Sequence, residues 1–368
     1  SEALIKNGTI NELLDNSKRF SGELAKKLRE RIYDSVVPEL ANGITDARKL
    51  INPSVADINL TYEMALTILF RILFIAYAED RDLLPYKHNE KYRKRSLKQK
   101  AQELSGKSDS EIAQGSYHWN ETLELFRAIY IGNKEWGIPA YAGTIFSNDR
   151  AISEAGFLID NISLENQYFE KALKSLLTID TDSKQIGPVD FRSLSVREFG
   201  TVYEGLLESE LSQAEFDLTR DKKENYIPAK EGNTIYVKKG EIYLHNKSGA
   251  RKSSGSFFTP DFAVEHLLDK SLEPALQSHF NKLDSLDDLN AAEELFNFRV
   301  ADIAMGSGHF LVAAIDRIEI RITEYLDKRP LALVKSELNT LKISALNQLK
   351  ELSEQNIEDI QLLKRLIA

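Results

Sequence analysis

The residues whose types and spacing best suit a chemical role lie in the segment RVADIAMGSGHFLVAA, residues 299–314. An alternating apolar run enters a loop that contains Gly306 and Gly308, and an apolar, helix-like run leaves it. Glycines allow positive φ and a close approach of backbone N–H groups to a ligand, and the following helix adds partial positive charge. Asp302 would stand at the end of a strand predicted over 298–304, where ligands bind in α/β sheets. The pattern predicts the first strand, turn and helix of a nucleotide-binding unit.

The spacing alone leaves the ligand of this loop open. A dinucleotide-binding fingerprint needs G-x-G-x-x-G, and Leu311 stands where the third glycine would be. A P-loop needs a lysine after its last glycine, and this sequence has His309 there. A tight turn without any ligand is therefore one alternative, and an NAD-binding enzyme is a weaker one.

At these residues the sequence resembles adenine-specific DNA methyltransferases of the type IIG restriction-modification kind and related phage-defence enzymes. Their S-adenosylmethionine loop reads D-P-A-x-G-S-G-x-F, and Asp302 to Phe310 match it except at Ile303, which replaces proline. A second family motif, G-x-[FY]-[FY]-T-P, stands upstream at Gly255 to Pro260. The segments LFRILFIAYAEDRDLLP, PAYAGTIFSND and VREFGTVYEGLLESEL look like the helical region that precedes the methyltransferase domain in this family.

The resemblance implies a binding site for the cofactor S-adenosylmethionine. Asp302 and the glycine loop would hold its methionine end, and the upstream motif would line the same pocket. Phe310 would pack under the loop, and a role in the core alone is equally open to it. The implied cofactor-binding residues are Phe258, Thr259, Pro260, Asp302, Ala304, Gly306, Ser307, Gly308 and Phe310.

The family's catalytic motif is absent from this sequence. The family transfers the methyl group with [DNS]-P-P-[YFW], which holds the exocyclic amine of a flipped adenine. The chain has nine prolines, and no two of them are adjacent. The acidic residue that grips the cofactor ribose is not found either. We therefore expect the amino-terminal part of a longer enzyme, inactive without its carboxy-terminal methyltransferase and target-recognition regions. The alternative is a non-enzymatic helical DNA-binding or assembly module with a vestigial cofactor loop.

A basic segment, KHNEKYRKRSLKQK at 87–100, suggests double-stranded DNA as a partner. It holds seven lysines and arginines and one acid, although the whole chain has a net charge of −9. Such a run can track phosphates without reading bases, and a solvated surface is an equally open interpretation. The residues predicted to contact phosphates are Lys91, Arg93, Lys94, Arg95 and Lys98. The six histidines show no metal-ligand spacing, and we find no nuclease motif.

The surrounding elements predict a mainly α amino-terminal domain over 1–185 and a connector with a helix and a β-hairpin over 186–250. The first part of an α/β Rossmann-like methyltransferase domain follows over 251–368. The hairpin is expected at 232–246, where β-formers alternate around Lys239-Gly240.

The most apolar run, residues 66–78, is shorter than a bilayer span, so we expect a buried helix and no membrane. The polar amino terminus and the lack of cysteine favour a cytoplasmic protein.

Overall fold

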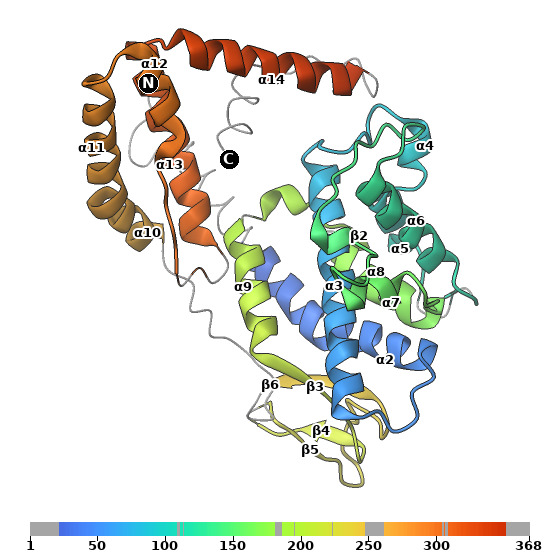
Figure 1. Ribbon diagram of the computed structural model, residues 1–368. Coiled ribbons are helices and arrows are strands. Elements are labelled where there is room, and N and C mark those ends of the chain that lie inside the picture. The colour runs from blue at the N-terminus through green and yellow to red at the C-terminus, as the bar shows by residue number, and fades with distance from the viewer. Residues whose placement is uncertain are drawn as a thin grey trace, which may run out of the picture. The chain divides into compact units, whose positions relative to one another are not determined.

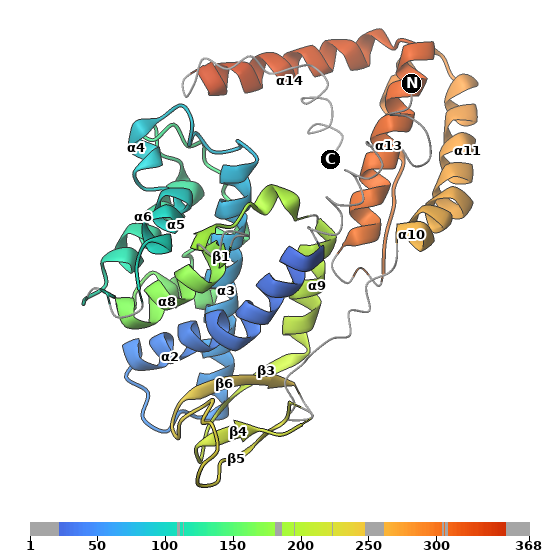
Figure 2. The same cartoon turned by 180° about the vertical axis from the view of Figure 1, so that it is seen from behind.

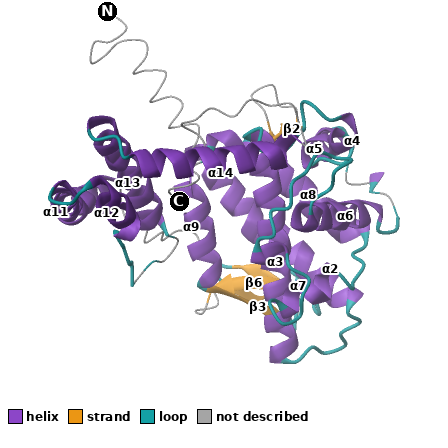
Figure 3. Cartoon of the chain, turned by 45° about the horizontal axis from the view of Figure 1, so that its top comes forward, coloured by secondary structure: helices purple, strands orange, loops and turns teal. Residues whose placement is uncertain are grey.

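The computed structural model divides the chain into two compact units, Ser1–Gly255 and Ser256–Ala368. Both units are mainly helical, and Figure 3 shows how few strands accompany the helices. The sequence predicts this for the amino-terminal helices, whereas for residues 251–368 it predicts the start of an α/β domain. The structure describes residues 22–108, 111–112, 114–180, 186–194, 196–222, 224–246, 261–303, 305 and 308–350.

The first unit is built around helix α3 (Val55–Asp80), which runs through the middle of its helices in Figure 1. Helices α2, α5 and α7 pack against it. After the helical residues 22–31, the helical elements that the structure describes in this unit are η2 (Ile32–Val36), α2 (Val37–Ala47), α4 (Glu90–Arg93), α5 (Leu97–Ser105), α6 (Tyr117–Ile131), η4 (Thr144–Phe146), α7 (Glu154–Ile159), α8 (Asn166–Leu177), η5 (Phe191–Ser193) and α9 (Val196–Leu207).

Helix α3 begins at a capping box. The Ser54 hydroxyl accepts from the backbone N–H of Asp57 at 3.2 Å, and the Asp57 carboxylate accepts from the backbone N–H of Ser54 at 3.1 Å. This satisfies N–H groups that a helix start leaves without an intrahelical partner. Beyond this cap, buried positions such as Met64, Ile68 and Ile72 fill the core of the unit. The run 66–78 thus lies in a helix whose apolar side chains are largely buried.

Among the described residues, α3 is the one helix whose length and composition would allow it to cross a membrane. Half of its most apolar stretch is buried inside the protein. Arg71, within the apolar run 66–78, is 1% exposed and is hydrogen-bonded within the unit.

The strands form two-stranded antiparallel sheets. The pairs in the described part of the chain are β1 (Thr178–Asp180) with β2 (Ile186–Pro188), β3 (Ser209–Gln213) with β6 (Ile242–Asn246), and β4 (Leu218–Arg220) with β5 (Tyr226–Pro228). Strands β3 and β6 pack on α3 and α2, so the segment expected as a connector lies in the same unit as the helices.

The predicted hairpin over 232–246 is wrong in its pairing. A turn does form at Gly240, whose φ is +90°, and Gly240 N donates to Ala214 O. However, β6 pairs with β3, while Val237 forms an isolated bridge with Leu218. The pairing with β3 places Ile242 and Leu244 in the core of the helical unit, which a local hairpin would not do.

Strand β6 is also joined to helix α2 through one side chain. Asn42 Nδ2 donates to Ile242 O at 2.9 Å, and Ile242 N donates to Asn42 Oδ1 at 2.8 Å. Figure 2, the view from behind, shows β6 beside the end of the unit where α2 lies. Residues 200 positions apart in the chain thereby share two hydrogen bonds.

The second unit has a helical core of its own, in which Leu276, Leu283 and Leu295 are fully buried. Arg317 joins its helices by ion pairs to Glu265, Asp269 and Glu273. The helical elements described in this unit are α10 (Asp261–Leu267), η6 (Leu268–Leu272), α11 (Glu273–Asp284), α12 (Asp288–Glu294), η7 (Leu295–Asn297), α13 (His309–Lys328) and α14 (Ala332–Lys350).

The strand predicted over 298–304 is not formed in the described residues 298–303, whereas the helix expected after it is present as α13. A strand needs a neighbouring strand to satisfy its backbone N–H and C=O groups. In the part of this unit that the structure describes, no strand is available to pair with it.

Candidate functional site

A groove in the second unit contains two of the residues implied in cofactor binding. It has a volume of about 550 Å³, and both Asp302 and Phe310 line it. Its walls are largely apolar, with Leu268, Leu272 and Phe298 among them. Arg299 also lines the groove, so its charged lining includes a guanidinium beside the Asp302 carboxylate. An apolar groove of this kind suits a ligand with an apolar body and groups of both charges.

Gly308 has the conformation that makes a glycine necessary. It is the N-cap of α13 with φ +80°, a left-handed backbone that side-chain-bearing residues rarely adopt. Its N–H donates to Met305 O at 2.8 Å, which closes the turn before the helix. An added Cβ would meet only Met305 Cγ, at 3.9 Å, so the requirement comes from conformation rather than from space.

Asp302, Gly308 and Phe310 are the implied cofactor residues that the structure describes. Asp302 is half-buried, and Phe310 packs partly buried against the apolar core of the second unit. The other implied cofactor residues lie outside the described part of the chain: Phe258, Thr259, Pro260, Ala304, Gly306 and Ser307.

Three of the five predicted phosphate contacts are exposed, and each also has a partner inside the chain. Lys91 Nζ lies 2.6 Å from the Glu135 carboxylate, and Lys94 Nζ lies 2.8 Å from that of Glu90. The Arg93 guanidinium donates to two backbone carbonyls of the preceding loop, at 2.9 and 2.8 Å. Surface pairs of this kind are weak, so these cations can exchange their partners for phosphates.

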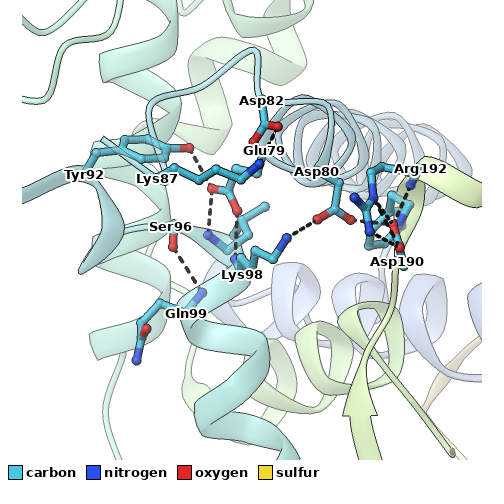
Figure 4. Close-up of polar contacts among 12 residues, drawn as sticks. Glu79, Asp80, Asp82, Lys87, Tyr92, Ser96, Lys98, Gln99, Asp190 and Arg192 are labelled. Atoms are coloured by element: carbon cyan, nitrogen blue, oxygen red, sulfur yellow. Dashed lines mark hydrogen bonds and ion pairs between the residues drawn. The ribbon is translucent and has the colours of Figure 1, made fainter. Parts of the chain in front are cut away.

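The other two predicted contacts are turned toward the protein. Arg95 lies between the carboxylates of Glu121 and Glu124, at 3.3 and 3.2 Å. Lys98 Nζ donates to Asp80 at 2.6 Å, and Figure 4 shows its side chain turned toward that carboxylate. Lys98 is therefore better suited to holding α5 on α3 than to reaching DNA.

Glu79, which the sequence analysis did not select, is the anchor of the basic segment. Its carboxylate accepts from Tyr92 Oη at 2.7 Å and from the backbone N–H groups of Leu97 and Lys98 at 2.9 and 2.8 Å (Figure 4). The last two groups are the first N–H groups of α5, where a helix attracts negative charge. Burial raises the pKa of Glu79 to about 7, and the donated hydrogen bonds oppose that rise.

Asp80, the next residue, holds two segments at once. Its carboxylate accepts one hydrogen bond from Lys98 Nζ and another, at 2.8 Å, from the backbone N–H of Phe191. The only trace of this role in the sequence is an acidic pair directly after a long apolar run. Nothing in the sequence pairs these acids with residues 92–98 or 191.

A buried arginine positions the loop after α6. Arg71 Nε donates to Ile145 O at 2.7 Å, Arg71 Nη2 donates to Ser147 O at 3.1 Å, and the guanidinium lies over the Phe126 ring. Burial lowers the pKa of Arg71 to about 10. The residue that interrupts the apolar run of α3 therefore fixes the segment that contains Ile145 and Ser147.

Comparisons of this chain with protein-family models, curated proteins and solved structures found no match. Among the described residues, no group of three or more histidine, aspartate or glutamate side chains is placed to hold a metal ion. Functional interpretation therefore depends on the motifs and on the geometry above.

Proposed function

We propose that this chain is the cofactor-loop part of an adenine-specific DNA methyltransferase of a restriction-modification or phage-defence system. The observation that carries the proposal is that Asp302 and Phe310, the two ends of the D-x-A-x-G-S-G-x-F motif, line one groove before and within α13. The left-handed Gly308 between them supports the same interpretation. The finer fold that belongs to this proposal is the first part of a Rossmann-like domain that binds S-adenosylmethionine.

The proposed chemistry divides between this chain and further polypeptide. The Asp302 carboxylate would pair with the cationic methionine end of S-adenosylmethionine, while the groove would cover apolar parts of the molecule. Positioning the adenine amine needs a Pro-Pro-aromatic motif, and no two prolines of this sequence are adjacent. We therefore infer that methyl transfer requires a carboxy-terminal region of the enzyme, and that this chain alone transfers no methyl group.

One observation favours a second candidate function. Residues 298–303 form no strand, so the described part of this unit does not form the sheet edge on which the cofactor would rest. A helical DNA-binding or assembly module with a vestigial cofactor loop would also lack a strand at these residues. Cofactor binding distinguishes the two candidates.

Weak binding of S-adenosylmethionine is the expected result for the 368-residue chain, and Asp302→Ala should weaken it at least tenfold. The reason is that one charge-assisted hydrogen bond contributes roughly 1.5–3 kcal/mol, and about 1.4 kcal/mol is tenfold in affinity. Ligand-observed NMR at millimolar cofactor is suited to such weak binding.

The matched control for this measurement is Asp316→Ala, which removes an exposed carboxylate from the same helix region. Loss of the NMR effect in the Asp302 variant alone supports the proposed cofactor site. Equal effects in both variants, or none in the unmodified chain, would favour the vestigial module.

DNA binding by the basic segment should depend on Lys91 and Lys94, two of its exposed lysines. Replacing both by glutamine should weaken binding to all DNA sequences alike, because phosphate contacts carry no base readout. The slope of log K against log salt should also become shallower by about 0.9 for each phosphate that is no longer neutralised. Fluorescence anisotropy at several salt concentrations measures both quantities.

The control for this double variant is Lys26→Gln with Lys27→Gln, two exposed lysines of the helical residues 22–31. It changes the net charge equally at another place. If both double variants lower affinity and slope by the same amount, the segment 87–100 is an ordinary solvated surface.

A further inference from the structure

Strands β3 and β6 bring a serine, a histidine and a glutamate together on one face. Glu210 and His245 are directly opposite each other in the register, and Ser212 is two residues further along β3. Ser212 Oγ lies 2.7 Å from His245 Nε2, and His245 Nδ1 lies 3.8 Å from Glu210 Oε1. The two nitrogens of one imidazole thus face a hydroxyl on one side and a carboxylate on the other.

The carboxylate favours the imidazole tautomer that a base needs. A proton on Nδ1 is attracted by Glu210, and this leaves the Nε2 lone pair to accept the hydrogen bond from the Ser212 hydroxyl. A nucleophile and a base within hydrogen-bond reach form the core of the arrangement of serine nucleophiles. Glu210 stands on the third side, where at 3.8 Å it acts on the base by its charge and not by a hydrogen bond.

The packing around the histidine holds this arrangement in place. On the opposite face of the sheet, Leu211, Ile242 and Leu244 are buried in the core of the helical unit. The imidazole is 9% exposed, and the Tyr243 ring lies beside it with centroids 5.1 Å apart. A base that is fixed by packing needs little rearrangement when a proton is transferred.

We propose that Ser212 is an activated nucleophile that accepts acyl groups from carboxylic esters. Ser212 Oγ forms a bond to the ester carbonyl carbon while its proton moves to His245 Nε2. The bond from that carbon to the alcohol oxygen then breaks, and the alkoxide takes the proton from His245. No redox partner or metal is needed, and this activity is separate from the proposed methyltransferase role.

A purely structural trio would behave differently. Polar cross-strand pairs stabilise sheets by about 0.2–1 kcal/mol and give a serine no unusual reactivity. An adjacent general base typically accelerates attack by about 10²–10⁴-fold. The two interpretations therefore differ in the rate at which Ser212 attacks an electrophile, and this rate can be measured on the folded chain.

The test uses an alkyl fluorophosphonate on the full chain, with the labelled peptides identified by mass spectrometry. Phosphonylation forms an Oγ–P bond and releases fluoride, so the adduct at Ser212 is stable and can be counted. We expect labelling of Ser212 and none of Ser35, whose hydroxyl lies 2.9 Å from the Ser175 hydroxyl and has no base in that contact. Absence of label at Ser212 overturns the proposal.

His245→Gln should lower the labelling rate of Ser212 at least 100-fold, because glutamine keeps a hydrogen-bonding group but cannot take the proton. Glu210→Gln should lower the rate less, since it only removes the group that orients the base. Glu210 is 49% exposed by its side chain, so this variant disturbs the core little and serves if the histidine variant fails to fold. Unchanged labelling in the folded variants assigns the trio a structural role.

Discussion

Gly156→Ala is expected to destabilise the helical unit by about 3 kcal/mol, although alanine is normally the better helix residue. A Cβ at this position of α7 would lie 2.1 Å from Ser147 O and 3.1 Å from Arg71 Nη2. The carbonyl cannot move away freely, because Arg71 holds it from the buried side. Urea unfolding followed by circular dichroism measures the loss.

Gly106→Ala is the control for this substitution. Gly106 ends α5 with an ordinary negative φ, and an added Cβ would meet only Glu103 O at 3.9 Å. We expect a change within about 1 kcal/mol there. If the two variants unfold at the same urea concentration, the prediction is wrong. The Ser147 carbonyl can then move away from the added Cβ at little cost in stability, in spite of its hydrogen bond to Arg71.

Glu79→Gln should also be strongly destabilising, by about 2–3 kcal/mol, because three donors point at this carboxylate. The amide group of glutamine would place its own N–H donors against at least one of these donors. The exposed Glu103→Gln, on the neighbouring helix α5, is the matched control and should be nearly neutral.

The same variant has an expected pH dependence. The pKa of Glu79 is about 7 in the folded chain and near 4.5 in the unfolded one, so the folded state binds the extra proton between these values. The stabilisation from this proton is complete below pH 4.5 and is lost as the pH rises through about 7. The deficit of Glu79→Gln relative to the unmodified chain should therefore be larger at pH 5 than at pH 8. A deficit that is equal at both pH values would mean that Glu79 is ionised throughout.

Helices were predictable from the sequence because their apolar periodicity is local. The buried run 66–78 and the helix after Gly308 both follow from residues within a few turns of one another. The predictions of a strand over 298–304 and of a hairpin over 232–246 were wrong, because strand pairing is not local in the sequence. A strand exists only where another strand pairs with it, and the partner of β6 lies before β4, outside any local window.

The candidate sites were also predictable where their residues are close in the sequence, and not where the residues are distant. Asp302 and Phe310 belong to one short motif, and they do line one groove. The basic segment was visible as charge, but its partners are distant in the sequence: Glu79 and Asp80 come from α3, and Glu135 comes from the turn after α6. The inward turn of Lys98 was therefore not visible. Ser212 and His245 are 33 positions apart, and only the β3–β6 register reveals their contact.

The two hydrogen bonds between Asn42 and Ile242 affect the order in which this chain folds. During synthesis the amino-terminal helices emerge first, and domains generally fold as their residues appear. Here, however, Asn42 of α2 makes two of its hydrogen bonds to Ile242, a residue that is synthesised 200 positions later. Contacts of such long sequence separation must first overcome the entropy of closing a large loop, which slows folding. A nascent chain that ends before β6 therefore exposes the apolar face that Ile242 and Leu244 later cover, and it remains open to aggregation until that strand arrives.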